Sequence, residues 1–234
     1  MIRNERADIR CGVRVPVVEA MKRALDLFCC DGGAAMGLFD AGFDEIVGID
    51  IDPHPNYPFD FIRADATRPP VDLSEFHFIW ASPPCQGFSW SAGNARNNLG
   101  YVYPNLIEPT RDLLKKSGLP YCIENVMEAP IREDLMLCGL SFGLAVYRHR
   151  KFEISGFRAE RPKHFSHHNQ RRIKKVITCA GHGSITEGGS AKIKDWQNAM
   201  GIHHTKNRKY LAEAVPPAYS KYIASEFFRT GDIK

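Results

Sequence analysis

Cys85 occupies a setting that suits a nucleophile. It follows Pro83 and Pro84 in the segment ASPPCQGFSW, at the end of an apolar run over residues 77–82. The two prolines stiffen this exit from a predicted strand and fix the direction of the cysteine. A polar segment with glycines, residues 86–103, comes next and is typical of a mobile loop that closes over a substrate. A lone cysteine is more often a small buried hydrophobic residue, so it is the setting that predicts a reactive thiol.

Glu124 is the candidate acid. It stands near the end of YCIENV, the next predicted strand along the chain. After four mostly apolar residues its carboxyl group is expected to be partly desolvated, which raises the pKa and allows proton donation near neutral pH. The alternative is that Glu124 or Asn125 caps the following segment.

Two arginines, Arg148 and Arg150, stand two residues apart in YRHRKFE. On a strand this spacing puts them on one face, where paired guanidinium groups can hold a phosphate or a base carbonyl. Arginines of this kind are more often surface charges.

The segment DLFCCDGGAAMG, from Asp26 to Gly37, links a predicted strand to a predicted helix. Glycines there let a ligand approach the backbone, and a helix start offers free N–H groups, so the segment predicts a nucleoside-type cofactor. Asp50 ends the next strand, where a carboxylate can accept hydrogen bonds from ribose hydroxyls. Asp65 ends the third strand in the same way. Structural turns and caps are the alternative explanation for these residues.

Short apolar runs alternate with amphipathic segments in the first two thirds of the chain, which predicts an α/β fold with a mainly parallel sheet covered on both faces. Binding sites in such sheets lie at the carboxyl ends of the strands. The predicted strands are residues 25–29, 45–50, 61–65, 77–82, 121–126 and 150–155, and the predicted helices are residues 34–41 and 104–118.

Four segments are expected: an N-terminal extension (1–24), a catalytic, cofactor-binding domain (25–155), a small basic module (156–199) and a C-terminal segment that packs back on the core (200–234). Residues 156–176 carry seven Lys or Arg and one acid. This basic run is either a solvated face or a surface that binds a polyanion. The final segment has helical spacing on both sides of Pro216 and Pro217.

The histidines of the basic module raise the question of a metal. The spacing of His164, His167, His168, Cys179 and His182 matches no common zinc pattern, so no metal site is predicted. Contact with phosphates or base edges is preferred for these residues.

The composition indicates a soluble protein in a reducing compartment. No apolar run reaches the 18 or so residues that cross a membrane, and the first residues lack the features of a signal peptide. The seven cysteines form an odd set without a CxxC pair, which is a poor disulfide framework. A cytoplasmic protein is expected.

The segments DLFCCDGGAAMG, GIDID, SPPCQGFSW, IENV, RHR and AEAVPPAY resemble, in this order, the motif series of the DNA (cytosine-5)-methyltransferase family. The resemblance covers about residues 25–155 and 196–229. It implies a Rossmann-like, S-adenosylmethionine-dependent methyltransferase fold with a small inserted target-recognition module. It also implies S-adenosyl-L-methionine as methyl donor and double-stranded DNA as partner for a monomeric enzyme of a bacterial cell or phage-infected host.

The resemblance gives each matching residue a role. Cys85 would add to C6 of a flipped cytosine, Glu124 would engage the ring nitrogen, and Arg148 and Arg150 would contact the base and its surroundings. The implied cofactor pocket consists of Asp26, Phe28, Gly32, Gly33, Asp50, Ile51, Asp65, Pro84 and Val215.

Three positions depart from the family pattern. Cys30 replaces a usual glycine, Val146 replaces a usual glutamine, and Ala212-Glu213 replaces a usual Gly-Asn pair. Two alternative functions remain open at this point: a tRNA cytosine-5 methyltransferase, and a catalytically silent DNA-binding protein. The target bases and a restriction partner are not predicted from the sequence.

Overall fold

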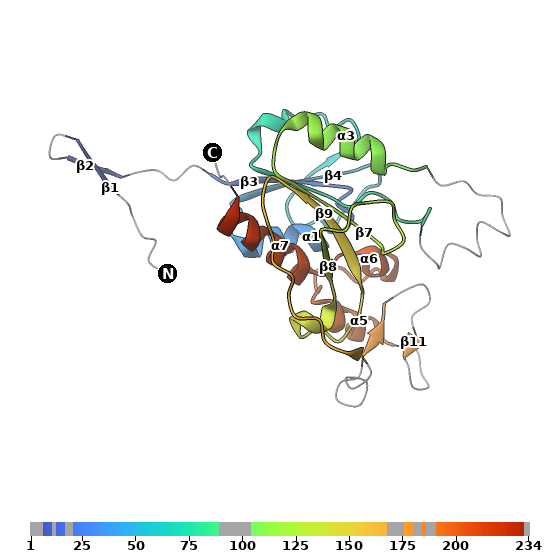
Figure 1. Ribbon diagram of the computed structural model, residues 1–234. Coiled ribbons are helices and arrows are strands. Elements are labelled where there is room, and N and C mark those ends of the chain that lie inside the picture. The colour runs from blue at the N-terminus through green and yellow to red at the C-terminus, as the bar shows by residue number, and fades with distance from the viewer. Residues whose placement is uncertain are drawn as a thin grey trace.

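A seven-stranded sheet forms the centre of the molecule (Figure 1). The computed structural model describes residues 7–10, 13–16, 21–88, 104–167, 176–179, 184–185 and 191–231. The strand order is β5-β4-β3-β6-β7-β9-β8. The strands are β3 (Arg23–Leu27), β4 (Glu45–Asp50), β5 (Asp60–Arg63), β6 (Phe78–Ala81), β7 (Tyr121–Asn125), β8 (Leu135–Leu137) and β9 (Arg150–Ser155).

Strands β5, β4, β3, β6 and β7 are parallel to one another, whereas β9 is antiparallel to both β7 and β8. The prediction of an α/β fold with a mainly parallel sheet is therefore confirmed. The chain also forms two short antiparallel pairs, β1 (Ala7–Arg10) with β2 (Val13–Pro16) and β10 (Ile177–Thr178) with β11 (Ser184–Ile185).

The helices cover the sheet, and glycine or proline residues mark several of their ends. They are α1 (Gly33–Ala41), α3 (Ile107–Ser117), α5 (Ile193–Met200), α6 (Arg208–Glu213) and α7 (Pro217–Thr230), with 3-10 turns η1 (Leu73–Glu75) and η3 (Gly139–Phe142). Glycines with positive φ flank α1, at 83° for Gly32 and 118° for Gly42. Helix α7 starts with Pro217, because a proline at the first helical position needs no N–H partner.

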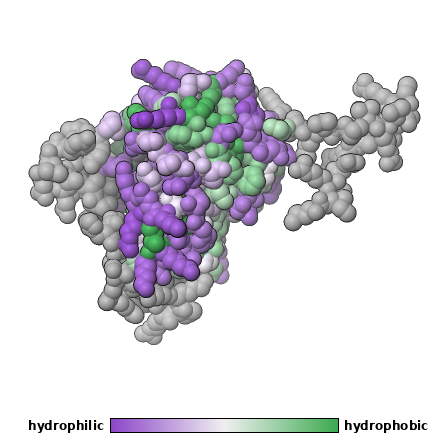
Figure 2. All heavy atoms as spheres, turned by 180° about the vertical axis from the view of Figure 1, so that it is seen from behind, coloured by the Kyte–Doolittle hydropathy of each residue, from purple (hydrophilic) through white to green (hydrophobic). Residues whose placement is uncertain are grey.

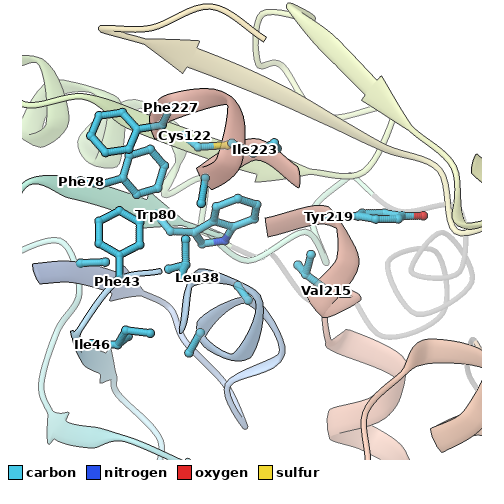
Figure 3. Close-up of a cluster of buried hydrophobic side chains, with 14 of the residues drawn as sticks. Leu38, Phe43, Ile46, Phe78, Trp80, Cys122, Val215, Tyr219, Ile223 and Phe227 are labelled. Carbon is cyan, nitrogen blue, oxygen red and sulfur yellow. The ribbon is translucent and has the colours of Figure 1, made fainter. Parts of the chain in front are cut away.

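Alternating residues of the strands feed two hydrophobic cores, one on each face of the sheet. In β6, Phe78 and Trp80 pack with α1 and α7, while Ile79 and Ala81 pack on the face of α3. Figure 3 shows the first core, in which Phe43, Phe78 and Phe227 come together beside Trp80. Both faces of the sheet are thus covered, as its apolar strands require.

The predicted elements agree with the structure to within a few residues at their ends. Strands over 45–50 and 150–155 are matched in full, while the helix predicted from residue 104 begins at Ile107. Strand β8 and helix α5 were not predicted. With three residues, β8 is too short for an alternating pattern to be visible.

The segment after β9 has a small core of its own. Trp196 and Met200 of α5 pack with Ile177 of β10, Leu211 of α6 and Val146. Helix α5 spans the predicted boundary between residues 199 and 200. The division into four segments stays a prediction, and residues 168–175, 180–183 and 186–190 of the module lie outside the described residues.

The surface seen from behind in Figure 2 is mostly hydrophilic with scattered hydrophobic areas. The exposed large hydrophobic residues of the described chain are Met21, Phe39 and Ile51. None of the helices in the described ranges combines the length and apolarity that a membrane crossing requires.

The packing of α1 on α7 makes a sharp prediction about Gly37. A Cβ atom there would lie 2.0 Å from the Pro217 carbonyl oxygen and 2.1 Å from Ser220 Oγ. Helix propensity alone favours alanine over glycine by about 1 kcal/mol, but overpacking costs about 1–3 kcal/mol or more. We expect Gly37→Ala to lower the free energy of unfolding in urea titrations, with Ser225→Ala on the exposed face of α7 close to neutral. A stabilised Gly37→Ala protein would contradict this packing.

Candidate functional site

A pocket lies where the carboxyl ends of β3, β4, β6 and β7 meet. Residues from all four groups singled out in the sequence line it: the cysteine segment, the acid strand, the arginine pair and the glycine-rich segment. Every residue predicted for the site lines the pocket except Arg148 and Gly32; the lining members are Asp26, Phe28, Gly33, Asp50, Ile51, Asp65, Pro84, Cys85, Glu124, Arg150 and Val215. The parallel strands therefore bring together residues that are far apart in the sequence.

Cys85 lies at the turn after β6 and is partly buried. The turn closes when the Phe88 amide donates to the Cys85 carbonyl oxygen at 2.9 Å. The buried side chain of Asn125, at the end of β7, donates to the Pro83 carbonyl oxygen at 2.8 Å and so ties this segment to the neighbouring strand. Burial and the nearby Glu124 raise the pKa of the Cys85 thiol, whereas Arg150 and Arg148 act in the opposite direction.

Glu124 is buried, with 5% of its surface exposed. Its Oε1 atom lies 2.9 Å from Nε of Arg150, and Ser82 is a further hydrogen-bonding partner. Ser82 in turn accepts a hydrogen bond of 2.9 Å from the indole N–H of Trp80. Burial raises the pKa of Glu124, although Arg150 opposes the rise. The carboxyl group is thus more ready to carry a proton than an exposed glutamate.

Arg148 differs from the sequence expectation. It precedes β9, has a φ of 38° and does not share a strand face with Arg150. Its guanidinium group donates to backbone carbonyl oxygens of Ala212 (2.6 Å), Ala214 (2.8 Å) and Cys179 (3.0 Å). Burial and the neighbouring Arg150 lower the pKa of Arg148 to about 9, so the group remains cationic at neutral pH. Because its donors already hold protein carbonyls, Arg148 joins three chain segments behind the pocket.

The acids at the strand ends have distinct surroundings. Asp50 accepts from the backbone amides of Cys30 (3.0 Å) and Asp52 (3.1 Å). Asp65 accepts from both the amide and the hydroxyl of Thr67, and these bonds lower its pKa. Asp26 is buried, and burial raises its pKa to about 8 despite a contact with the Tyr57 hydroxyl. Asp50 and Asp65 therefore offer carboxylate acceptors, whereas Asp26 is suited to hold a proton.

The glycines of the strand-to-helix turn have a structural role that the sequence did not reveal. At Gly32, which has a φ of 83°, a Cβ atom would lie 2.6 Å from Pro58 Cδ. At Gly33 it would lie 2.4 Å from the Val215 carbonyl oxygen. Close packing of protein atoms, rather than the approach of a ligand, explains why these two positions lack side chains.

Sequence reasoning missed several pocket residues, His54 above all. His54 is buried; its Nδ1 lies 3.0 Å from Asp31 Oδ1 and its Nε2 lies 3.6 Å from Asp50 Oδ2. Lys209, Tyr210 and Glu213 also line the pocket. The spacing of four residues between Asp50 and His54 is the feature of the sequence that could have indicated this contact. It indicates the contact only when the conformation of the turn after β4 is known.

Two buried acceptors in the pocket lack a partner. Asp26 Oδ1 and Gln86 Oε1 are shielded from solvent, and no described residue donates to them. Buried polar atoms without partners are uncommon in folded proteins. The pocket is therefore suited to a ligand with hydrogen-bond donors.

Comparisons with known proteins show a family similarity over part of the chain and a shared fold. The family model of C-5 cytosine-specific DNA methylases matches residues 22–118, which contain Cys85. A solved structure named as a prophage-encoded DNA modification methyltransferase of E. coli has a TM-score of 0.54 at 13% identity, covering 89% of this chain and 99% of that chain. This likeness shows a shared fold.

A second solved structure, named as the methyltransferase yhhF from Escherichia coli, has a TM-score of 0.28 at 16% identity and covers 49% of this chain and 65% of that chain. No curated protein sequence matches the chain. The family match covers 97 of the 234 residues, so this part of the chain is similar to C-5 cytosine-specific DNA methylases.

Proposed function

We propose that the pocket transfers a methyl group from S-adenosyl-L-methionine to C5 of cytosine in double-stranded DNA, through a covalent adduct between Cys85 and C6. The observation that supports it best is that Cys85, Glu124 and Arg150 line one pocket with the acids Asp50 and Asp65. We further propose that the protein acts as a monomer in the cytoplasm of a bacterial cell or phage-infected host.

Cytosine C5 is a weak nucleophile, so the ring is activated first by addition at C6. The Cys85 thiolate forms a bond to C6 while Glu124 gives its proton to N3, which makes C5 enamine-like. After C5 has taken the methyl group, a solvent water takes the C5 proton, the sulfur–C6 bond breaks to release the Cys85 thiolate, and the N3 proton returns to Glu124. A stacked base cannot present C6 to a side chain, so the cytosine must first leave the helix.

The positive charge of Arg150 supports the proposed roles of both Cys85 and Glu124. It lies against Glu124 and favours the thiolate of Cys85. It also keeps the raised pKa of Glu124 from rising further. We assign Arg150 to hold Glu124 in place beside the base, and Arg148 to support the segment that carries Arg150.

The residues present fit S-adenosylmethionine, which when bound would supply an electrophilic methyl group. Asp50 would accept from the ribose hydroxyls, because a carboxylate has lone pairs beyond the two already used. Asp65 and Phe28 would hold the adenine, and the first N–H groups of α1, at Gly33 and Ala34, would take the carboxylate. The unpaired Asp26 Oδ1 and Gln86 Oε1 atoms support a ligand that carries polar hydrogen-bonding groups.

The basic module, residues 156–199, is proposed to contact DNA. Its excess of Lys and Arg over acids would neutralise phosphates and make binding sensitive to salt. At about 40 residues the module is small, so a short or loosely specified target is expected.

Trapping on DNA that contains 5-fluorocytosine tests the mechanism. Fluorine at C5 cannot leave as a proton does, so the adduct should persist and migrate as a covalent complex in denaturing gels. We expect Cys85→Ala to abolish the adduct and to lower methyl transfer by about a thousandfold or more.

Cys179→Ser, a buried thiol outside the pocket lining, should still form the adduct. Absence of any adduct with the wild-type protein on DNA would overturn the proposal. Adduct formation on tRNA, and not on DNA, would indicate a tRNA cytosine-5 methyltransferase.

Replacement of Asp50 tests the cofactor assignment. We expect Asp50→Ala to weaken binding of S-adenosylhomocysteine about 10- to 100-fold in calorimetric titrations, because two hydrogen bonds to a charged acceptor are lost. Asp60→Ala, an exposed acid on the neighbouring strand, is the matched control and should bind normally. Equal affinity of the two variants would remove Asp50 from the cofactor site.

The pH dependence of methyl transfer tests the role of Arg150. Its positive charge lowers the pKa of both Cys85 and Glu124. Without it the thiolate forms only at higher pH, and Glu124 keeps its proton to higher pH. Both limbs of the kcat/KM profile of Arg150→Gln should therefore move to alkaline pH, by about 1 pH unit. Arg161→Gln, in the exposed basic module, is expected to change DNA affinity without this shift; an unshifted Arg150→Gln profile would contradict the assignment.

A further inference from the structure

Four side chains with metal-binding atoms converge away from the pocket. Cys138 directly follows β8, His149 directly precedes β9, and His164 and His167 lie in the segment after β9. The ligand atoms of all four lie within 4.8 Å of one another. None of the four lines the methyl-transfer pocket.

Two of the separations between ligand atoms are close to the edges of a metal-centred tetrahedron, and all of them are within 4.8 Å. Cys138 Sγ lies 3.4 Å from Nε2 of His167, and Nε2 of His149 lies 3.2 Å from Nε2 of His164. In a tetrahedral zinc site with Zn–N bonds of about 2.0–2.1 Å and a Zn–S bond of about 2.3 Å, the N–N edges are about 3.4 Å and the S–N edges about 3.6 Å. Separate hydrogen bonds would explain the two short distances but not the convergence of both pairs.

Ring packing holds the imidazoles in this arrangement. The ring of His167 stacks on Tyr147 with centroids 4.0 Å apart and on His149 with centroids 4.8 Å apart, at interplanar angles of 16° and 14°. Cys138 is buried with 1% of its surface exposed. These ring contacts and the burial of Cys138 hold the donor atoms close together.

We propose that Cys138, His149, His164 and His167 bind one zinc ion. One thiolate and three imidazoles are the borderline-soft donors that zinc prefers, and the absence of a carboxylate from the set disfavours magnesium and calcium. Four protein ligands complete a tetrahedron and leave no open position for substrate, which is typical of a structural site.

The ion would join two parts of the chain. It would link Cys138 and His149, from the sheet region, to His164 and His167, at the beginning of the basic module. His149 stands between Arg148 and Arg150, so the metal would also fix the segment that carries both arginines. The expectation of no metal site considered only the module's own residues; the fold adds Cys138 and His149 to two of them.

Metal analysis of the full-length protein tests the proposal independently of methyl transfer. Protein purified without chelators should contain about one zinc ion per chain, measured by inductively coupled plasma mass spectrometry. After exchange for Co²⁺, the visible spectrum should show the bands of a tetrahedral site and a near-ultraviolet charge-transfer band from the thiolate. Cys138→Ser should lose the charge-transfer band, and His164→Ala, altered at an exposed position, should bind Zn²⁺ at least about tenfold more weakly in competition with a chromophoric chelator.

Cys179→Ser and His203→Ala, outside the cluster, are the matched controls and should retain metal. Circular dichroism of each variant shows whether it folds. If Cys138→Ser does not fold, the exposed substitution His164→Ala still tests the proposal. Wild-type protein that neither contains zinc nor binds added Zn²⁺ would overturn the proposal, as would full affinity in folded His164→Ala. Adduct formation with 5-fluorocytosine DNA in a zinc-free protein would leave the methyl-transfer proposal intact.

Discussion

The ion pair between Glu124 and Arg150 is the interaction on which the site depends. A buried carboxylate alone would be costly, and a cation beside it offsets part of that cost. The two residues come from neighbouring antiparallel strands, β7 and β9, so the partner is supplied by the sheet itself. Arg150 and Cys85 line the same pocket, and the one positive charge lowers the pKa of both the acid and the thiol.

Most of the sheet, and the meeting of Cys85 with Glu124, could be predicted from the sequence. Apolar runs identify parallel strands, and parallel strands put their carboxyl ends at one edge. Residues just after such runs therefore lie together even when 39 positions separate them, as Cys85 and Glu124 do. The order of the motifs indicated the family resemblance on which the proposed cofactor rests.

Contacts that depend on irregular chain segments could not be predicted. Nothing in the spacing of Asn125 indicates that its side chain holds the Pro83 carbonyl, and a buried His54 between two acids requires the turn after β4. Arg148 was assigned to one strand face with Arg150, but the strand begins at Arg150 and Arg148 lies before it in an irregular segment with positive φ. The cysteine and histidine cluster was missed for the same reason: its members come from three segments that only the folded chain brings together.

The three carbonyl acceptors of Arg148 have a mechanical consequence. They come from Cys179, Ala212 and Ala214, and thus from both the basic module and the segment that returns to the core. Moving any of these carbonyl groups away would remove a hydrogen bond from the buried Arg148 cation. A buried charged group that loses a hydrogen bond destabilises the fold. The basic module proposed to contact DNA and the C-terminal segment that lines the pocket are therefore both hydrogen-bonded to Arg148. A movement of either segment would change the position of the other.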